Sequence, residues 1–200
     1  MPESTVTAAY GARSDEYTSL FGDIASAHPD DRALVAEWAR GLDGPVVDLG
    51  CGPGQWTDFL HAHGAEISGV DPTPEFVAIA RSRHPQLEFR AGDARRLDLP
   101  GGSVAGVLAW YSLIHLAPDE LTAALAEIAR VLRPGGALLV GFFDGGEVEQ
   151  FAHAVAPAWF WPPERLGEEL DRAGFRIEEV VRRRTAEARP HAAVVARRAG

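Results

Sequence analysis

The stretch Val46–Leu60 reads VVDLGCGPGQWTDFL and decides the fold, because it joins an apolar run to a glycine-rich turn and then to a helical pattern. The run Val46–Leu49 is typical of a short buried strand, and residues 56–63 show helical spacing of apolar side chains. Glycines at 50, 52 and 54 allow positive φ and let a ligand approach the backbone closely. The stretch therefore predicts a ligand site just beyond the end of a strand.

The rest of the chain repeats this alternation of strands and helices. Helices are predicted at 29–40, 56–63, 73–83, 118–132 and 163–173, and strands at 46–49, 66–70, 87–90, 104–110, 137–143, 175–181 and 192–197. Such repeats indicate a parallel sheet with helices on both faces. The last two strands have no helix between them and must be antiparallel, because a parallel crossover needs about a dozen residues or more. We predict a Rossmann-like α/β fold with a seven-stranded, mostly parallel sheet and an antiparallel strand near one edge.

The length of 200 residues suits about one domain, which we place at 29–200. Residues 1–28 contain aromatic side chains without a strong period, and we expect them to form a short helical arm over this domain. The sequence has neither a long apolar run nor a cationic-then-apolar start, so neither a membrane span nor a signal peptide is expected. The single cysteine, Cys51, fits a reducing, cytoplasmic setting.

The charge of the chain bears on its partners. The formal net charge is -10, and every basic side chain is an arginine. Because an acidic surface repels phosphate backbones, we expect no nucleic-acid partner. The histidines lack the spacing of metal ligands, so no bound metal is expected. The cluster Arg182–Arg184 with Arg189 is either a solvated strand edge or part of a binding surface.

The glycine turn and three aspartates together predict the kind of ligand. A dinucleotide site needs G-x-G-x-x-G, whose third glycine would fall where Gln55 stands. Asp48, just before the turn, suits an ammonium group better than a pyrophosphate. Asp71 follows at the spacing of a residue that accepts hydrogen bonds from ribose hydroxyls. Asp93, after the third strand, could accept a hydrogen bond from an adenine amino group. Each aspartate could alternatively be a helix N-cap or turn residue.

Four segments resemble a known family. VVDLGCGPG, GVDP, AGDARRLDLP and LRPGGALLVGFF look like successive motifs of class I S-adenosylmethionine-dependent methyltransferases of the small-molecule type, and with the closing strand pair they cover the chain from about residue 30. The resemblance implies S-adenosylmethionine as cofactor, S-adenosylhomocysteine as product, and an arm that covers the cofactor site with Tyr17 and Tyr10. The residues implied at the cofactor are Tyr17, Asp48, Gly50, Cys51, Gly52, Gly54, Asp71, Pro72, Gly92, Asp93, Ala94 and Trp110.

The resemblance also places the methyl acceptor. In AWYSLIHLAPDEL, the residues just past the fourth strand would flank the methyl donor and face the acceptor. His115 is the candidate general base, because histidine accepts protons near neutral pH, and Ser112 is the second catalytic candidate. Alternatively, His115 packs under the following helix and Ser112 caps the turn. The residues expected at the acceptor are Tyr111, Ser112, His115, Phe143, Trp161 and His191.

Two of these acceptor residues have plain structural alternatives. Trp161 belongs to the segment Trp159–Trp161, which could equally be satellite core. His191 could be an ordinary residue at the start of a strand. The acceptor side is expected to consist of the arm, the segment after the fourth strand and the 144–162 connection.

The sequence therefore favours methyl transfer to an oxygen, nitrogen or carbon atom of a small molecule, by proximity and in-line alignment. We expect a monomer or homodimer. Two other functions stay open at this point: a nicotinamide-dependent oxidoreductase, and a module that binds S-adenosylmethionine without catalysis.

Overall fold

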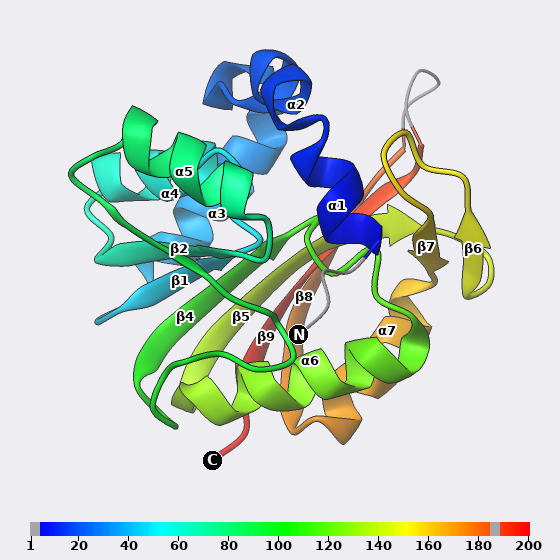
Figure 1. The fold of residues 1–200 in the computed structure, drawn as a ribbon. Helices are drawn as coiled ribbons and strands as arrows, with labels where there is room; N and C mark the ends of the chain where they lie inside the picture. Colours follow the sequence, from blue (N-terminus) through cyan, green and yellow to red (C-terminus); the bar gives the residue numbers. More distant parts are fainter. Residues whose placement is uncertain (1–4, 185–188) are drawn as a thin grey trace.

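The computed structural model describes residues 5–184 and 189–200. Within them, one nine-stranded sheet has the order β3-β2-β1-β4-β5-β7-β6, with β9 paired to β5 and β8 to β9 (Figure 1). The strands are β1 (Val46–Leu49), β2 (Ile67–Asp71), β3 (Glu88–Ala91), β4 (Val104–Trp110), β5 (Leu132–Asp144), β6 (Glu149–Phe151), β7 (Ala158–Trp161), β8 (Phe175–Arg183) and β9 (His191–Arg198). The helices are α1 (Thr5–Gly11), α2 (Ser14–Phe21), η1 (Ile24–Ser26), α3 (Pro29–Arg40), α4 (Gln55–Ala62), α5 (Pro74–Arg83), α6 (Pro118–Val131) and α7 (Pro163–Arg172).

The predicted α/β sheet is confirmed in its core. Strands β1 to β5 pair in parallel, with β1 between β2 and β4. The closing strand β9 runs antiparallel to both β5 and β8, as the short connection between β8 and β9 requires. Chain order reverses between β1 and β4, and ligands bind at such a switch point in open α/β sheets.

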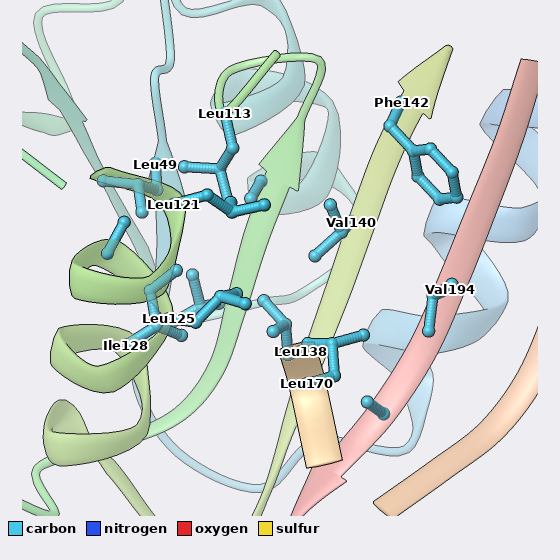
Figure 2. Packing of buried hydrophobic residues seen from close by; sticks show 14 of the residues in the cluster. Leu49, Leu113, Leu121, Leu125, Ile128, Leu138, Val140, Phe142, Leu170 and Val194 are labelled. Carbon is cyan, nitrogen blue, oxygen red and sulfur yellow. The ribbon is translucent and has the colours of Figure 1, made fainter. Parts of the chain in front are cut away.

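Helices cover both faces of the sheet, with α3, α4 and α5 on one side and α6 and α7 on the other (Figure 1). Helix α6 packs on the sheet through one apolar face, on which Leu121, Leu125 and Ile128 recur at helical spacing and are almost fully buried. Figure 2 shows these side chains packed with Leu49 and Leu113, next to the residues that β5 and β9 contribute. This core holds the carboxyl ends of β1 and β4 in fixed positions.

The sheet has nine strands where seven were predicted, because the 144–162 connection forms the hairpin β6–β7. Strand β7 pairs in parallel with Phe143 and Asp144, just past the point where β4 ends opposite Gly141. Since β9 occupies the other edge of β5, β7 lies in line with β4 beyond its end. The Trp159 amide also donates to the Ile114 carbonyl at 2.8 Å. The hairpin therefore walls the segment that follows β4.

Strand β5 begins five residues earlier than predicted. Residues 133–136, which lie between the predicted helix and strand, form an irregular part of this strand, and its register against β4 shifts between the pairs Val104–Leu132 and Gly106–Ala137. Gly135 has a φ of 74°, which glycine adopts without strain. Gly135 thus lies within the irregular stretch at which the register of β5 against β4 shifts.

The arm forms α1, α2 and η1, apart from residues 1–4, which lie outside the described residues. Helices α1 and α2 lie over the carboxyl-edge side of the sheet (Figure 1). Arg13 Nη1 donates to the Ala154 carbonyl at 2.6 Å, and Arg83 Nη2 donates to the Gly22 carbonyl at 2.7 Å. These bonds join the arm to the 144–162 connection and to α5. None of the helices in the described residues combines the length and apolarity that crossing a membrane needs.

Candidate active site at the carboxyl edge of the sheet

The three glycines of the turn have different tasks. Gly50, Gly52 and Gly54 have φ values of 76°, 52° and 89°, which disfavour any side chain. A Cβ at Gly50 would lie 2.1 Å from the Cβ of Ser112, and one at Gly54 would meet ring carbons at 3.0 Å. At Gly52 the nearest atom is a ring carbon of Tyr17 at 3.9 Å. Gly50 and Gly54 therefore permit close packing, while the backbone at Gly52 stays approachable.

Two buried carboxylates support the turn. Asp48 is 1% exposed and accepts a hydrogen bond from Thr57 Oγ1 at 2.7 Å, and burial raises its pKa to about 7. Asp71 accepts from the Gly52 amide at 2.9 Å through one oxygen and from the Thr73 amide at 2.8 Å through the other. Burial raises the pKa of Asp71 as well. Each oxygen of Asp71 keeps a lone pair for a further donor.

Asp93 lies at the same edge, after β3. Arg95 donates to it from its backbone amide at 2.8 Å and from Nη2 at 2.6 Å, and this arginine holds the pKa of Asp93 below its usual range. Arg95 also pairs with Glu120. Three further residues predicted at the cofactor adjoin these acids in sequence. Pro72 is exposed, and Gly92 and Ala94 are half-buried.

The segment after β4 begins with a strained residue. Among the described residues, Tyr111 is the one non-glycine with positive φ, at 56°, which costs about 1–3 kcal/mol. Its amide donates to the Gly141 carbonyl at 3.0 Å, and its hydroxyl is hydrogen-bonded to His191 Nδ1 at 2.5 Å. Trp110 lies against Gly141, where a Cβ would come within 2.9 Å of its ring. The Oγ of Ser112 is buried and has no partner in the described part of the chain.

His115 is held in one tautomer. Its Nδ1 lies 2.8 Å from the Pro157 carbonyl, which can only accept, so Nδ1 carries the proton. Nε2 therefore has the free lone pair, and the Tyr10 hydroxyl donates to it at 2.8 Å. Burial lowers the pKa of His115 and keeps the imidazole neutral near pH 7. A neutral imidazole with a directed lone pair has the form that a general base requires.

Around His115 lies a group of rings that we call the aromatic–histidine cluster. Its members are Tyr111, His115, Phe143, Phe151, His153 and His191. Phe143 is at its centre, with ring centroids of the neighbours at 5.3–5.9 Å. Burial lowers the pKa values of His153 and His191 to about 4, so both are neutral near pH 7. The cluster thus combines apolar ring surfaces with uncharged nitrogen atoms.

His153 was not singled out by sequence reasoning. It lies in the 144–162 connection, 5.4 Å from the ring of His115, and its Nδ1 is buried without a partner in the described residues. The predicted location of this connection on the acceptor side was the available signal. Trp161, by contrast, is 4% exposed and belongs to the main core, so no broad face of its ring is open to a ligand in this structure.

Tyr17 lies next to the turn, and Cys51 is part of it. The Tyr17 ring packs on Phe76 at 5.2 Å and faces Gly52, and burial raises its pKa to about 12. Cys51 is 3% exposed, and burial raises the pKa of its thiol. A buried protonated thiol is a poor nucleophile, so the side chain of Cys51 contributes packing while its backbone forms the turn.

The arginine cluster singled out in the sequence forms hydrogen bonds with carboxylates. In the arginine group at the end of β8, Arg183 donates to Asp31 at 2.7 Å and Arg184 to Asp144 at 3.0 Å, which matches the strand-edge alternative. No group of three or more potential metal ligands occurs in residues 5–184 and 189–200.

This geometry defines a class of protein. A glycine turn at the switch point, with acids at the ends of β1 and β2, belongs to α/β proteins that bind a nucleoside-containing cofactor at the carboxyl edge of the sheet. Residues 46–136 match the family model described as "Methyltransferase domain". The matched domain, the sheet order and the glycine turn are those of class I S-adenosylmethionine-dependent methyltransferases, which this chain resembles.

Individual relatives agree with this assignment. An O-methyltransferase from Pyrenophora dematioidea is 31% identical over 68% of this chain and 55% of its own length. The crystal structure of a 1,6-didemethyltoxoflavin-N1-methyltransferase from Burkholderia thailandensis, with bound 1,6-didemethyltoxoflavin and S-adenosylhomocysteine, is 26% identical and has a TM-score of 0.76 over 96% of this chain and 89% of that one. The chain spans about half the length of the first curated relatives it matches.

The fold is also shared with a protein named for a different reaction. The [4+2]-cyclase SpnF has a TM-score of 0.81 over 97% of this chain and 95% of that one, at 22% identity. This likeness concerns the fold alone. The nicotinamide-dependent alternative gains no support from these similarities.

Proposed function

We propose that this protein transfers a methyl group from S-adenosylmethionine to a small-molecule acceptor. The observation that carries the proposal is the contact between Gly50 and Ser112, where a Cβ on the glycine would lie 2.1 Å from the serine Cβ. This contact presses the turn of a cofactor site directly against the segment that bears His115. A cofactor on the turn and an acceptor near His115 would therefore meet.

The residues of the turn fit this cofactor. Asp71 has lone pairs left for ribose hydroxyls, and Asp48 beneath the turn would favour a positively charged amino group. Two polar atoms near the turn, Ser112 Oγ and Gln55 Oε1, are buried without partners in the described residues. Such atoms are costly unless a ligand or water satisfies them. Asp93 would accept from the adenine amino group, and Tyr17 would cover the bound molecule.

When bound, S-adenosylmethionine supplies a methyl group on a positively charged sulfur. The chain's own contribution is alignment and proton removal. His115 Nε2 would take the proton of an acceptor O–H or N–H, and the Pro157 carbonyl would stabilise the resulting imidazolium through Nδ1. The partly buried Phe151 ring would border the acceptor and exclude water, with the buried Phe143 ring packed against it at 5.4 Å. We also propose that the arm covers the cofactor, and that residues 29–200 form one catalytic domain.

We further infer that the acceptor is not a nucleic acid, because the chain carries a net charge of -10. A cytoplasmic location and a monomeric or homodimeric state complete the proposal.

A second candidate is a protein that binds S-adenosylmethionine without transferring its methyl group. The Tyr10 hydroxyl on His115 favours it, since the general base is engaged by the protein itself.

Calorimetric titration tests the cofactor assignment. S-adenosylhomocysteine should bind with one site per chain, and NADH should not bind. Asp71→Asn should weaken S-adenosylhomocysteine binding about tenfold or more, because hydrogen bonds to a charged group contribute about 1.5–3 kcal/mol. Methyl release over a panel of phenols, amines and carbon acids then separates the two candidates. Binding of NADH without binding of S-adenosylhomocysteine would refute the proposal.

A further inference from the structure

Tyr10 places a phenol on the candidate general base. Its hydroxyl donates to His115 Nε2 at 2.8 Å, and its ring meets the His115 ring edge-on with centroids 5.4 Å apart. Tyr17 and Phe76 contact the other parts of the Tyr10 ring at 5.8 and 6.0 Å. Burial raises the pKa of Tyr10, so the hydroxyl stays protonated and remains a donor. The space in front of Nε2 therefore already holds an aromatic hydroxyl.

The arm that carries Tyr10 is attached next to the same cluster. Arg13 donates to the carbonyl of Ala154, the residue after His153, at 2.6 Å. The outer side of α2 is open to solvent, with Leu20 58% and Phe21 50% exposed. The Tyr10 and Arg13 hydrogen bonds join the arm to the acceptor side. An acceptor can reach Nε2 when the Tyr10 hydroxyl leaves it.

The electrostatics around His115 narrow the acceptor chemistry. The histidines of the aromatic–histidine cluster are neutral near pH 7, and the guanidinium of Arg189 lies over the Phe151 ring at 5.0 Å. The positive charge of Arg189 disfavours a cationic amine beside this ring. A neutral imidazole with a lowered pKa is a weak base, and it removes a proton most readily from an acidic hydroxyl. Phenols, with a pKa of about 10, are far more acidic than aliphatic alcohols.

We propose that Tyr10 is a resident mimic of the acceptor, and that the acceptor is a planar aromatic compound whose phenolic hydroxyl replaces the Tyr10 hydroxyl on His115 Nε2. The inference rests on the proposed function, since it names the substrate class of the same site.

Fluorine NMR of 3-fluorotyrosine-labelled protein tests this displacement. The chain has three tyrosines, namely Tyr10, Tyr17 and Tyr111, so single Tyr→Phe variants assign the signals. The probe is 2-naphthol, and 2-methoxynaphthalene is its matched control because it lacks the hydroxyl proton. Titrations are run with and without S-adenosylhomocysteine. We expect 2-naphthol to move the Tyr10 signal towards its solvent-exposed position and to leave the Tyr111 signal in place.

Affinities supply the second readout. Tyr10→Phe keeps the ring but removes the competing hydroxyl, so 2-naphthol should bind about fivefold more tightly, with little change for 2-methoxynaphthalene. Leu20→Ala, on the same arm but exposed to solvent, should leave the affinity ratio of the two probes unchanged.

Three results would overturn the inference: no binding of 2-naphthol, binding with the Tyr10 signal unmoved, or an unchanged affinity ratio in Tyr10→Phe. A separate calorimetric titration with S-adenosylhomocysteine decides the proposed function. Loss of that binding sinks the methyltransferase assignment, whereas S-adenosylhomocysteine binding together with any of the three results sinks the role of Tyr10 alone.

Discussion

The contact between Gly50 and Ser112 makes a quantitative prediction for Gly50→Ala. An alanine at a φ of 76° costs about 1–2 kcal/mol. The added Cβ would lie 2.1 Å from the Ser112 Cβ, well inside contact distance, and forced overpacking costs about 1–3 kcal/mol more. The free energy of unfolding should therefore fall by about 2–5 kcal/mol, measured by urea denaturation.

Gly64→Ala is the matched control, because Gly64 has a φ of 90° and no atom within 4 Å of the Cβ position. Gly64→Ala should lower the free energy of unfolding only by the cost of the positive φ, about 1–2 kcal/mol. The double variant Gly50→Ala/Ser112→Gly removes the opposing Cβ. It should therefore recover the part of the free energy of unfolding that Gly50→Ala loses through overpacking. S-adenosylhomocysteine affinity should drop in Gly50→Ala and hold in Gly64→Ala. Equal losses of stability in the two single variants would refute the reasoning.

Three further predictions concern buried polar groups. Burial raises the pKa of Asp48 to about 7, so the folded state keeps the Asp48 proton to a higher pH than the unfolded state does. The free energy of unfolding should therefore fall between about pH 4 and pH 7, by up to about 1.4 kcal/mol per pH unit from this group. Asp48→Asn should flatten that slope in urea denaturation across pH. Tyr111→Phe removes the hydroxyl bonded to His191 and should lower the free energy of unfolding by about 1 kcal/mol; an unchanged urea midpoint would contradict a stabilising bond. His115→Gln should slow methyl transfer to a phenol acceptor about 10²–10⁴-fold, with calorimetric S-adenosylhomocysteine affinity nearly intact; unchanged turnover would remove His115 from the mechanism.

Elements with strong local signals could be predicted closely from sequence. Strand β4 has the predicted bounds Val104–Trp110, and α6 ends one residue before its prediction. In both, apolar periodicity and flanking turn residues agree. The hairpin β6–β7 was missed because strands of three and four residues, within a segment rich in proline and aromatic residues, carry little periodicity.

The candidate site divides in the same way. The glycines of the turn and Asp71 could be placed from spacing, since the turn and the strand end fix their positions. Tyr10 and His115 meet across 105 residues of sequence, and no local pattern encodes that contact. The positive φ of Tyr111 is equally hidden, because tertiary hydrogen bonds to Gly141 and His191 hold a conformation that tyrosine disfavours alone.

The hairpin β6–β7 has a consequence for how this protein could be re-engineered. Strand β7 pairs with just two residues of β5, Phe143 and Asp144, yet the hairpin and its flanks supply Phe151, His153 and the Pro157 carbonyl. Residues 145–160 thus form a contiguous segment, here called the cassette, that could be replaced without changing the glycine turn and its aspartates. Grafting this cassette from a relative should transplant acceptor preference without altering cofactor affinity, so one scaffold could be diversified by changing a single contiguous segment.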